Sequence, residues 1–262
     1  MDIPVFQAVL IGVWTAVCWS GMLLGIYTNR CLVLAFGVGV ILGDIPTALA
    51  VGAVGELAFM GFGVGAGGTV PPNPIGPGIV GTLLAITTEG VTPESALALS
   101  IPFAVAIQFL QTAIYTLCAG NQEAAKRALQ KGNLGKYRLV CNLTIILFAV
   151  CGFVLGLLAA TAMPLLQDFV GAIPAWLTKG LSVAGGMLPA IGFAMIMSVM
   201  LTKEVIPFAL LGYICAGYLK VPTVGIALVG LVFALKHYFD VKKAEELKPA
   251  AATEEVSHDD WI

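Results

Sequence analysis

The stretch from Gly43 to Gly81 constrains the fold more than any other part of the sequence. It holds eleven glycines and five prolines, yet the residues between them are mostly apolar. At membrane depth, backbone groups outside a helix are tolerated only where protein or a water-filled cavity surrounds them. Transporters build substrate sites from such broken helices. The stretch therefore predicts a Gly/Pro-rich broken segment at the substrate site of a membrane protein.

The rest of the chain is also apolar enough to lie in a membrane. Hydrophobic residues make up 59% of the 262 positions, and charged residues 11%, compared with about 25% in soluble domains. Within lipid only helices and closed barrels satisfy every backbone group. We therefore expect an all-α polytopic membrane protein in contact with membrane lipid. The net charge of −2 indicates no surface for a nucleic acid.

The lengths of the apolar runs separate crossings from hairpins, because a helix needs about twenty apolar residues to span a bilayer. Several runs are shorter than this, and we interpret them as limbs of re-entrant helical hairpins. The expected segments are a first hairpin, a Gly/Pro-rich substrate hairpin, a set of transmembrane helices and a terminal hairpin, at 1–43, 44–90, 91–201 and 204–238. A polar cytoplasmic tail follows over 239–262.

One polar loop predicts the orientation in the membrane. Residues 120–138 carry five basic residues against Glu123 alone, and the positive-inside rule places such a loop in the cytoplasm. We therefore expect residues 87–95 and 163–178 to face outward and the C-terminus to be cytoplasmic.

Glycine spacing adds two local predictions. The patterns GMLLG at 21–25 and GVILG at 39–43 place small residues four positions apart, which allows close packing of helices. The run at 182–195 contains two adjacent glycines and Pro189, so we expect a kink or local unwinding there.

Polar side chains inside apolar segments are the candidate site residues. Glu56 is surrounded by apolar residues, and a carboxylate in such a place indicates a functional site by default. Alternatively, it faces an aqueous vestibule or forms a structural ion pair. Gln108 and Gln111 lie three residues apart, on one helical face. They can bind ligand hydroxyls, or they can form hydrogen bonds between membrane helices.

The sequence does not indicate a catalytic centre, a metal site or a cofactor. Its six cysteines are scattered, and it contains neither a CxxC nor an HExxH motif. Gly63, Gly65 and Gly68 formally match GxGxxG, but no strand pattern precedes them, which argues against a dinucleotide site.

Five motifs together resemble one known family of membrane proteins. They are ILGDIPTAL, GELAFMGFGVGAGG with Glu56, the turn PPNP, GNLGKYR, and GLSVAGGMLPAIGFAM at 180–195. Through residue 238 the chain resembles the IIC membrane subunit of the mannose/fructose/sorbose family of bacterial sugar phosphotransferase systems (PTS). The turn at 70–73 and the acidic tail ending in Trp261 and Ile262 resemble the branch that handles N-acetylgalactosamine or galactosamine.

The resemblance implies a non-catalytic subunit that moves a sugar across the inner membrane. It implies a IID membrane partner, assembled as a trimer of heterodimers, and cytoplasmic IIA and IIB proteins that carry the phosphoryl group to the sugar. A core domain would move against a scaffold in an elevator-type cycle. The substrate-binding residues that it implies are Glu56, Gly68, Thr69, Pro71, Asn73, Gln108 and Gln111.

Two other classes of protein are compatible with a polar site in an apolar chain. In an ion- or proton-coupled secondary transporter, Glu56 and Asp44 would carry the proton. An integral membrane enzyme would need a nucleophile and a base at recognisable spacing, and the sequence shows none.

Overall fold

The structure, a computed structural model, describes residues 3–60, 72–203 and 205–246. Within these three ranges the chain forms helices and turns without a strand, which confirms the expected all-α class. Five of the described helices are long and apolar enough to cross a membrane. Contacts divide the chain into two units, Met1–Val199 and Met200–Ile262.

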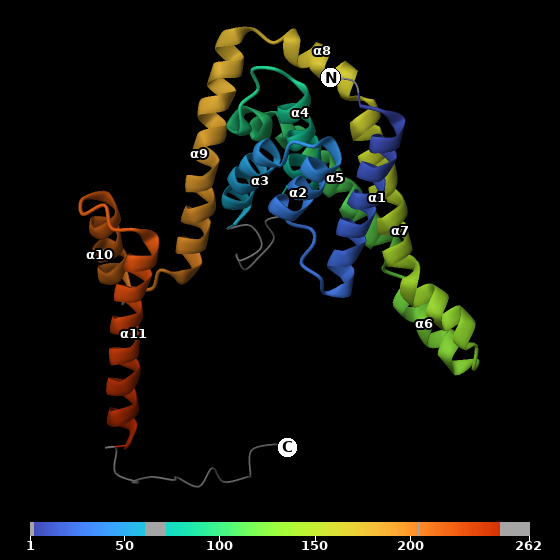
Figure 1. The fold of residues 1–262 in the computed structure, drawn as a ribbon. Coiled ribbons are helices and arrows are strands. Elements are labelled where there is room, and N and C mark those ends of the chain that lie inside the picture. The colour runs from blue at the N-terminus through green and yellow to red at the C-terminus, as the bar shows by residue number, and fades with distance from the viewer. Residues whose placement is uncertain (1–2, 61–71, 204, 247–262) are drawn as a thin grey trace, which may run out of the picture. The chain divides into compact units, whose positions relative to one another are not determined.

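The first unit contains most of the helices (Figure 1). They are α1 (Val5–Gly21), the 3-10 turn η1 (Met22–Leu24), α2 (Cys31–Leu42), α3 (Ile45–Phe59), the π-helix η2 (Gly76–Gly81), α4 (Thr82–Thr87), α5 (Pro93–Cys118), α6 (Asn121–Gln130), α7 (Leu134–Thr161), α8 (Met163–Gly171) and α9 (Ala175–Met200), whose last residue belongs to the second unit.

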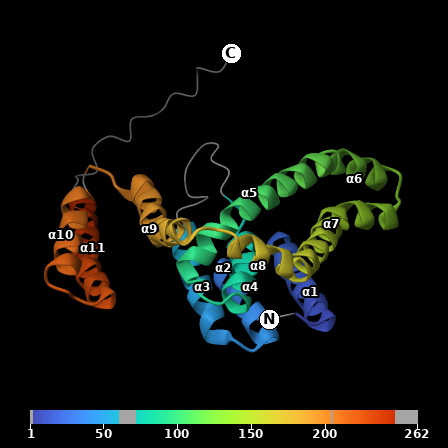
Figure 2. The ribbon, with the colours of Figure 1, turned by 90° about the horizontal axis from the view of Figure 1, so that it is seen from above.

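Helices α1 and α7 form the most extensive helix pair of the first unit, and they run antiparallel (Figures 1 and 2). Their backbones approach closely because glycines lie at the contact. A Cβ atom added at Gly156 would lie 2.9 Å from the Cα of Gly12, and one at Gly152 would lie 3.0 Å from the Cα of Ala16. Gly152 and Gly156 form a small-xxx-small pair that brings two helices together through van der Waals contact.

The two helices of the expected first hairpin each pack mainly on another helix. α1 with η1 spans Val5–Leu24 and is long enough to cross a membrane, and it packs mainly on α7. α2 packs mainly on α3, because Gly39 lies against Ala48 and Gly52 lies against Ala35. The insertion of the short helices as re-entrant hairpins stays a prediction.

In the two small-residue patterns, at 21–25 and 39–43, the first and the second glycine have different roles. Their first glycines, Gly21 and Gly39, lie in close contacts with Thr28 and Ala48. Their second glycines, Gly25 and Gly43, have φ values of 77° and 83° and end a helix in the left-handed conformation. Glycine is common at such C-caps because it has no Cβ atom to oppose this geometry.

The broken element η2 is fully buried between α2 and α5. A Cβ atom at Gly78 would lie 2.6 Å from the Cβ of Leu34 in α2, and one at Gly76 would lie 2.6 Å from the Cα of Ala104 in α5. A π-turn is rare in proteins and frequently lies at a functional site. The Gly/Pro-rich stretch thus places an irregular helix in the core. The break that the sequence predicted precedes this helix, and most of it lies outside the described residues.

The basic segment expected as a polar loop at 120–138 is largely helical. α5 continues through a short turn into α6, and α7 returns beside α6 (Figure 2). The helical form follows from good helix formers such as Ala124, Ala125 and Leu129. Arg127 forms an ion pair with Glu123 at 3.3 Å.

α9 is a continuous helix through 182–195, so the local unwinding that the sequence suggested is wrong there. Pro189 lies inside this helix. Membrane helices tolerate an internal proline because neighbouring groups satisfy the freed carbonyl.

The second unit consists of α10 (Ile206–Gly217) and α11 (Thr223–Glu246), which are joined by a ring contact between Phe208 and Phe233. α11 is long enough to cross a membrane over Thr223–Lys243, whereas two short limbs were expected. The helix also includes residues 239–246, which the sequence assigned to the tail. No glycine or proline follows Gly230 until Pro249, so nothing stops the helix at residue 238.

We expect the orientation to be measurable by cysteine labelling in a variant without the six native cysteines. Glu89→Cys should react with a membrane-impermeant maleimide from outside the cell, and Lys131→Cys only after the inner face is exposed. The reason is the positive charge of the α6 segment. Labelling of both positions from the same side would contradict this topology.

We expect Gly156→Ala to weaken the packing of α1 on α7. The added methyl group overlaps atoms of Gly12 and Thr15, and overpacking of this kind costs about 1–3 kcal/mol. The Tm of the purified membrane complex measures the effect. Gly230→Ala in α11 is the matched control, because a Cβ there meets nothing within 4 Å and should not lower the Tm. An equal Tm for both variants would refute the glycine contact.

Candidate functional site

The expected site residues that the structure describes fall into two polar clusters on either side of residues 61–71. The Glu56 cluster comprises Arg30, Cys31, Leu32, Glu56 and Pro74. The Asn73 cluster comprises Trp19, Asn73, Ala104, Gln108 and Gln111. The predicted residues Gly68, Thr69 and Pro71 lie outside the described residues.

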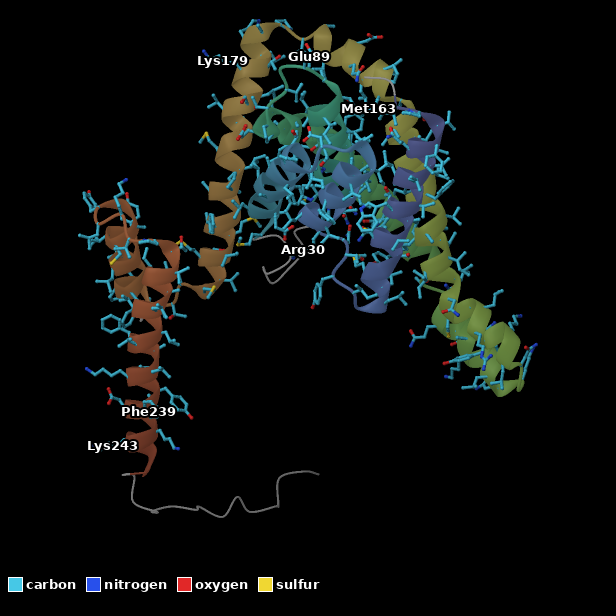
Figure 3. The ribbon with its side chains drawn as sticks, in the orientation of Figure 1. Arg30, Glu89, Met163, Lys179, Phe239 and Lys243 are labelled. Atoms are coloured by element: carbon cyan, nitrogen blue, oxygen red, sulfur yellow. The ribbon has the colours of Figure 1, made fainter. Side chains whose placement is uncertain are left out.

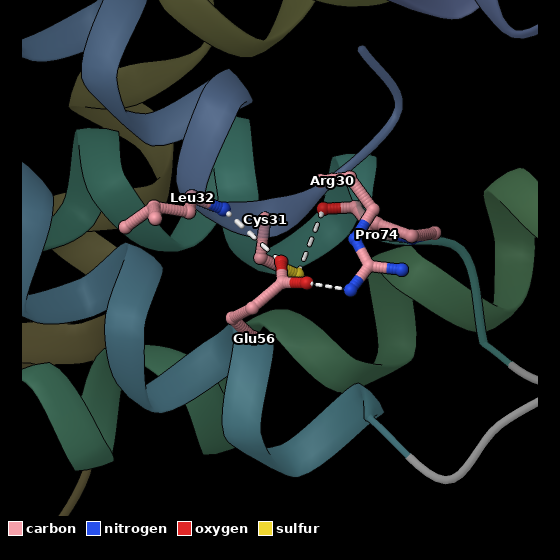
Figure 4. A network of polar contacts seen from close by, with 5 residues as sticks. All are labelled: Arg30, Cys31, Leu32, Glu56 and Pro74. Carbon is pink, nitrogen blue, oxygen red and sulfur yellow. Dashed lines mark hydrogen bonds and ion pairs between the residues drawn. The ribbon is translucent and has the colours of Figure 1, made fainter. Parts of the chain in front are cut away.

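Glu56 lies in the last turn of α3 and faces the start of α2 (Figure 4). Its carboxylate forms an ion pair with the guanidinium of Arg30, and the backbone N–H of Leu32 donates a hydrogen bond to Oε2 at 3.4 Å. Leu32 belongs to the first turn of α2, where unpaired N–H groups and the helix dipole attract negative charge. The ion-pair interpretation of Glu56 thus has a clear geometric basis.

Glycines bring the Glu56 carboxylate to this position. A Cβ atom at Gly55 would lie 3.2 Å from the Cβ of Cys31, and one at Gly52 would lie 2.9 Å from the Cβ of Ala35. α3 therefore approaches α2 closely at the turn that carries Glu56. The side chain of Glu56 stays 21% exposed and that of Arg30 51% exposed, so the carboxylate can also meet a ligand.

Asn73 is the centre of the second cluster and is almost fully buried. Its backbone N–H donates to the carbonyl of Ala104 at 3.0 Å, and its Oδ1 accepts from the N–H of Ile75 at 3.1 Å. Its Nδ2 donates a short hydrogen bond to Oε1 of Gln111 and a long one, at 3.5 Å, to Oε1 of Gln108. Asn73 thus fixes the residues that precede η2 to the middle of α5.

Gln111 also joins this cluster to α1. The indole N–H of Trp19 donates to Gln111 Oε1 at 3.2 Å, and the ring of Trp19 contacts that of Phe148 edge to face. Gln111 therefore forms the interhelical hydrogen bonds that the sequence left as one of two interpretations. The Nε2 groups of Gln108 and Gln111 have no hydrogen-bond partner within 3–60, 72–203 and 205–246, so they can still donate to a ligand.

The two clusters are connected through one thiol. Cys31 Sγ donates to the carbonyl of Pro74 at 3.7 Å, directly after Asn73 (Figure 4). A carboxylate with a paired cation on one side and carboxamide groups on the other can bind a neutral ligand rich in hydroxyl groups. Within the described ranges, no three His, Cys, Asp or Glu side chains gather as metal ligands would.

Sequence reasoning missed the roles of Arg30 and Trp19. A signal for Arg30 was available, because it is the only basic residue before Lys126 and its charge needs a partner in an apolar chain. Nothing in the spacing of Trp19 indicated its contact with Gln111. Asp44 is the N-cap of α3, where its Oδ1 accepts from the N–H of Thr47 at 3.2 Å.

Comparisons with known proteins identify the family of the chain. A family model described as the sorbose-specific IIC component of the PTS matches residues 5–236. N-acetylgalactosamine permease IIC component 1 of Escherichia coli (strain K12) is 32% identical over 241 residues, covering 90% of this chain and 88% of the relative. The sorbose-specific EIIC component of Lacticaseibacillus casei is 30% identical over 238 residues, covering 90% and 85%.

Two solved structures are also similar. One, described as a membrane protein, has a TM-score of 0.82 and 28% identity, and the match covers 90% of this chain and 96% of that one. The other is a complex of the mannose transporter ManYZ with microcin E492, with a TM-score of 0.57, 28% identity and coverage of 91% and 96%. The protein therefore belongs to the sorbose-specific IIC family, the multi-pass inner-membrane components of sugar phosphotransferase systems.

Proposed function

We propose that the chain binds a hexose or an amino sugar, with N-acetylgalactosamine or galactosamine favoured, and moves it across the inner membrane. The observation that carries this proposal is the pairing of the Glu56 and Asn73 clusters at the two ends of residues 61–71, inside an apolar bundle. The 32% identity to an N-acetylgalactosamine permease component supports the choice of sugar.

Each group in the two clusters has a role toward a sugar. The Glu56 carboxylate accepts hydrogen bonds from hydroxyl groups, and Arg30 compensates its charge while the site is empty. The free Nε2 groups of Gln108 and Gln111 donate to ring, hydroxyl or acetamido oxygens. Residues Gly68, Thr69 and Pro71 complete the contacts in this proposal. A direct contact with Asn73 requires exchange of its present hydrogen bonds, so Asn73 acts first as a positioning residue.

The proposal assigns the chemistry of phosphoryl transfer to other proteins. The chain pairs with a IID membrane subunit, three such pairs assemble, and cytoplasmic IIA and IIB proteins phosphorylate the sugar as it emerges. Many exposed apolar side chains on α9, α10 and α11 support a membrane partner or lipid contact. In an elevator-type cycle, α2, α3, η2 and α5 would move with the sugar.

The alternative of a proton-coupled transporter gains no support from the geometry. Asp44 caps a helix, and Glu56 is paired with a cation, whereas a proton carrier must be able to release and bind protons during the cycle. Uptake that requires phosphoenolpyruvate and persists without a proton gradient would support the phosphotransferase function. Uptake that stops when the gradient is collapsed would support the alternative.

We expect Glu56→Gln to weaken sugar binding by about fivefold to thirtyfold. A charge-assisted hydrogen bond contributes about 1.5–3 kcal/mol and a neutral one about 0.5–1.5, and each 1.4 kcal/mol is about tenfold in affinity. Calorimetry on the purified complex measures the change. Asp44→Asn is the control, because asparagine is an equally good N-cap and the affinity should stay the same. Unchanged affinity in Glu56→Gln would remove Glu56 from the sugar site.

We expect Asn73→Ala to lower the Tm of the complex. The substitution removes the acceptor of the buried N–H of Ile75, and an unsatisfied buried group costs about 1–3 kcal/mol. It also removes one of the two donors to Gln111 Oε1, which keeps its hydrogen bond from Trp19. Thr112→Ala on the exposed side of α5 is the control, since Thr112 bonds only to its own helix and its loss should have little effect. If the Asn73→Ala and Thr112→Ala variants have the same Tm, Asn73 is not a structural anchor.

A further inference from the structure

A pocket of about 530 Å³, lined in part by polar and charged side chains, lies at the end of the first unit where α5 begins. It is formed by the connection between α4 and α5, the first turn of α5, the end of α8 and the start of α9. Glu89 and Lys179 lie at this same end (Figure 3). Binding sites for small molecules have volumes of about 300–1,000 Å³, so the pocket can hold a monosaccharide.

The position of the pocket relates it to both clusters. α5 runs from this pocket to the basic α6 segment, so a cytoplasmic α6 places the pocket on the outer side of the membrane. η2 and α4 lead from the Asn73 cluster to Thr88 at the pocket. Twelve helical residues at 1.5 Å each correspond to about 18 Å along the axis. The pocket is therefore separated from the Asn73 cluster by the length of η2 and α4.

Polar groups in the pocket are available to a ligand. Thr88 Oγ1 is shielded from solvent and has no hydrogen-bond partner in the part of the chain that the structure describes. Over the same ranges, neither Glu89 nor Lys179 forms an ion pair. The hydroxyls of Thr92 and Ser182 lie 3.1 Å apart and join α5 to α9. A buried polar group without a partner requires an explanation, and a bound polar molecule supplies one.

The chemistry of the lining selects a neutral ligand with many hydroxyl groups. One carboxylate and one ammonium group balance each other, so the pocket favours neither anions nor cations, and the described residues offer no set of metal ligands. Hydroxyl and amide groups from Thr88, Thr178 and Gln167 match sugar hydroxyls as donors and acceptors. Among the lining residues whose side chains the structure describes, none is aromatic, so hydroxyl, amide and charged groups supply the contacts in this proposal.

We propose that this pocket is an outer binding site that holds the sugar before it reaches the Glu56 and Asn73 clusters. This inference rests on the proposed function in sugar transport. Lys179 donates to hydroxyl or acetamido oxygens, and Glu89 accepts from hydroxyl groups.

Thiol protection in the complete complex with its membrane partner tests the proposal. Ser182→Cys is introduced into a variant without native cysteines, and the rate of maleimide labelling is measured with N-acetylgalactosamine, galactosamine or mannose. Gly180→Cys is the matched control, because it lies two residues away on α9, outside the pocket lining, with open space around its Cβ. Sugar at roughly ten times its dissociation constant should slow labelling about tenfold at position 182 and leave position 180 unchanged.

The same measurement in a Glu56→Gln variant distinguishes the outer pocket from the proposed sugar site at the Glu56 and Asn73 clusters. In Glu56→Gln, protection at position 182 should persist at the same sugar concentration, although binding at the Glu56 cluster is weakened. Loss of protection in the Glu56→Gln variant would show that protection at position 182 arises from sugar bound at the Glu56 and Asn73 clusters. That result would overturn the proposal. Normal uptake without protection, or a position 182 that maleimide cannot reach because lipid or a partner covers it, would overturn it as well. Absence of both uptake and protection with every sugar would overturn the proposed function together with it.

Discussion

Close contact between helix backbones is the constraint on which the first unit depends. The irregular η2 can be buried because Gly76 and Gly78 let α5 and α2 approach it on both sides. The same device joins α1 to α7 through Gly12, Gly152 and Gly156. In lipid, apolar surface alone does not drive helices together, so packing of small residues and polar contacts must do so. Glycine is thus a structural requirement of this core.

Polar contacts between helices organise the two clusters. The Glu56 carboxylate meets Arg30 and the start of α2, and the Asn73 amide meets two glutamines of α5. These bonds fix both ends of the connection over residues 61–71 to helices. A ligand at this place would find an organised set of acceptors and donors, whose reorganisation would couple binding to movement of α2, α3 and α5. Such coupling is what a transport subunit requires.

Several features of the fold followed from the sequence with clear physical reasons. Composition predicted the all-α membrane class, because a chain that is 59% hydrophobic must satisfy its backbone groups within helices in lipid. Boundaries were less predictable. α11 extends to Glu246 because no glycine or proline stops it, and α9 continues through Pro189 because neighbouring groups in a membrane protein can satisfy the freed carbonyl. The pairing of α1 with α7 could not be predicted, because many glycines in the chain allow close packing and only the tertiary structure selects among them.

The sequence by itself determined the class of protein, the family resemblance and the candidate polar residues, since charge and amide groups in an apolar chain are few and therefore informative. The tertiary structure decided which of them meet. It paired Glu56 with Arg30, joined Asn73 to Gln108 and Gln111, and used Asp44 as a helix cap. The cap is a local contact between Asp44 and Thr47, whereas the Glu56–Leu32 and Asn73–Gln111 contacts join residues that are 24 and 38 positions apart. Local spacing carries no information about such contacts, because they form only when helix packing brings the side chains together.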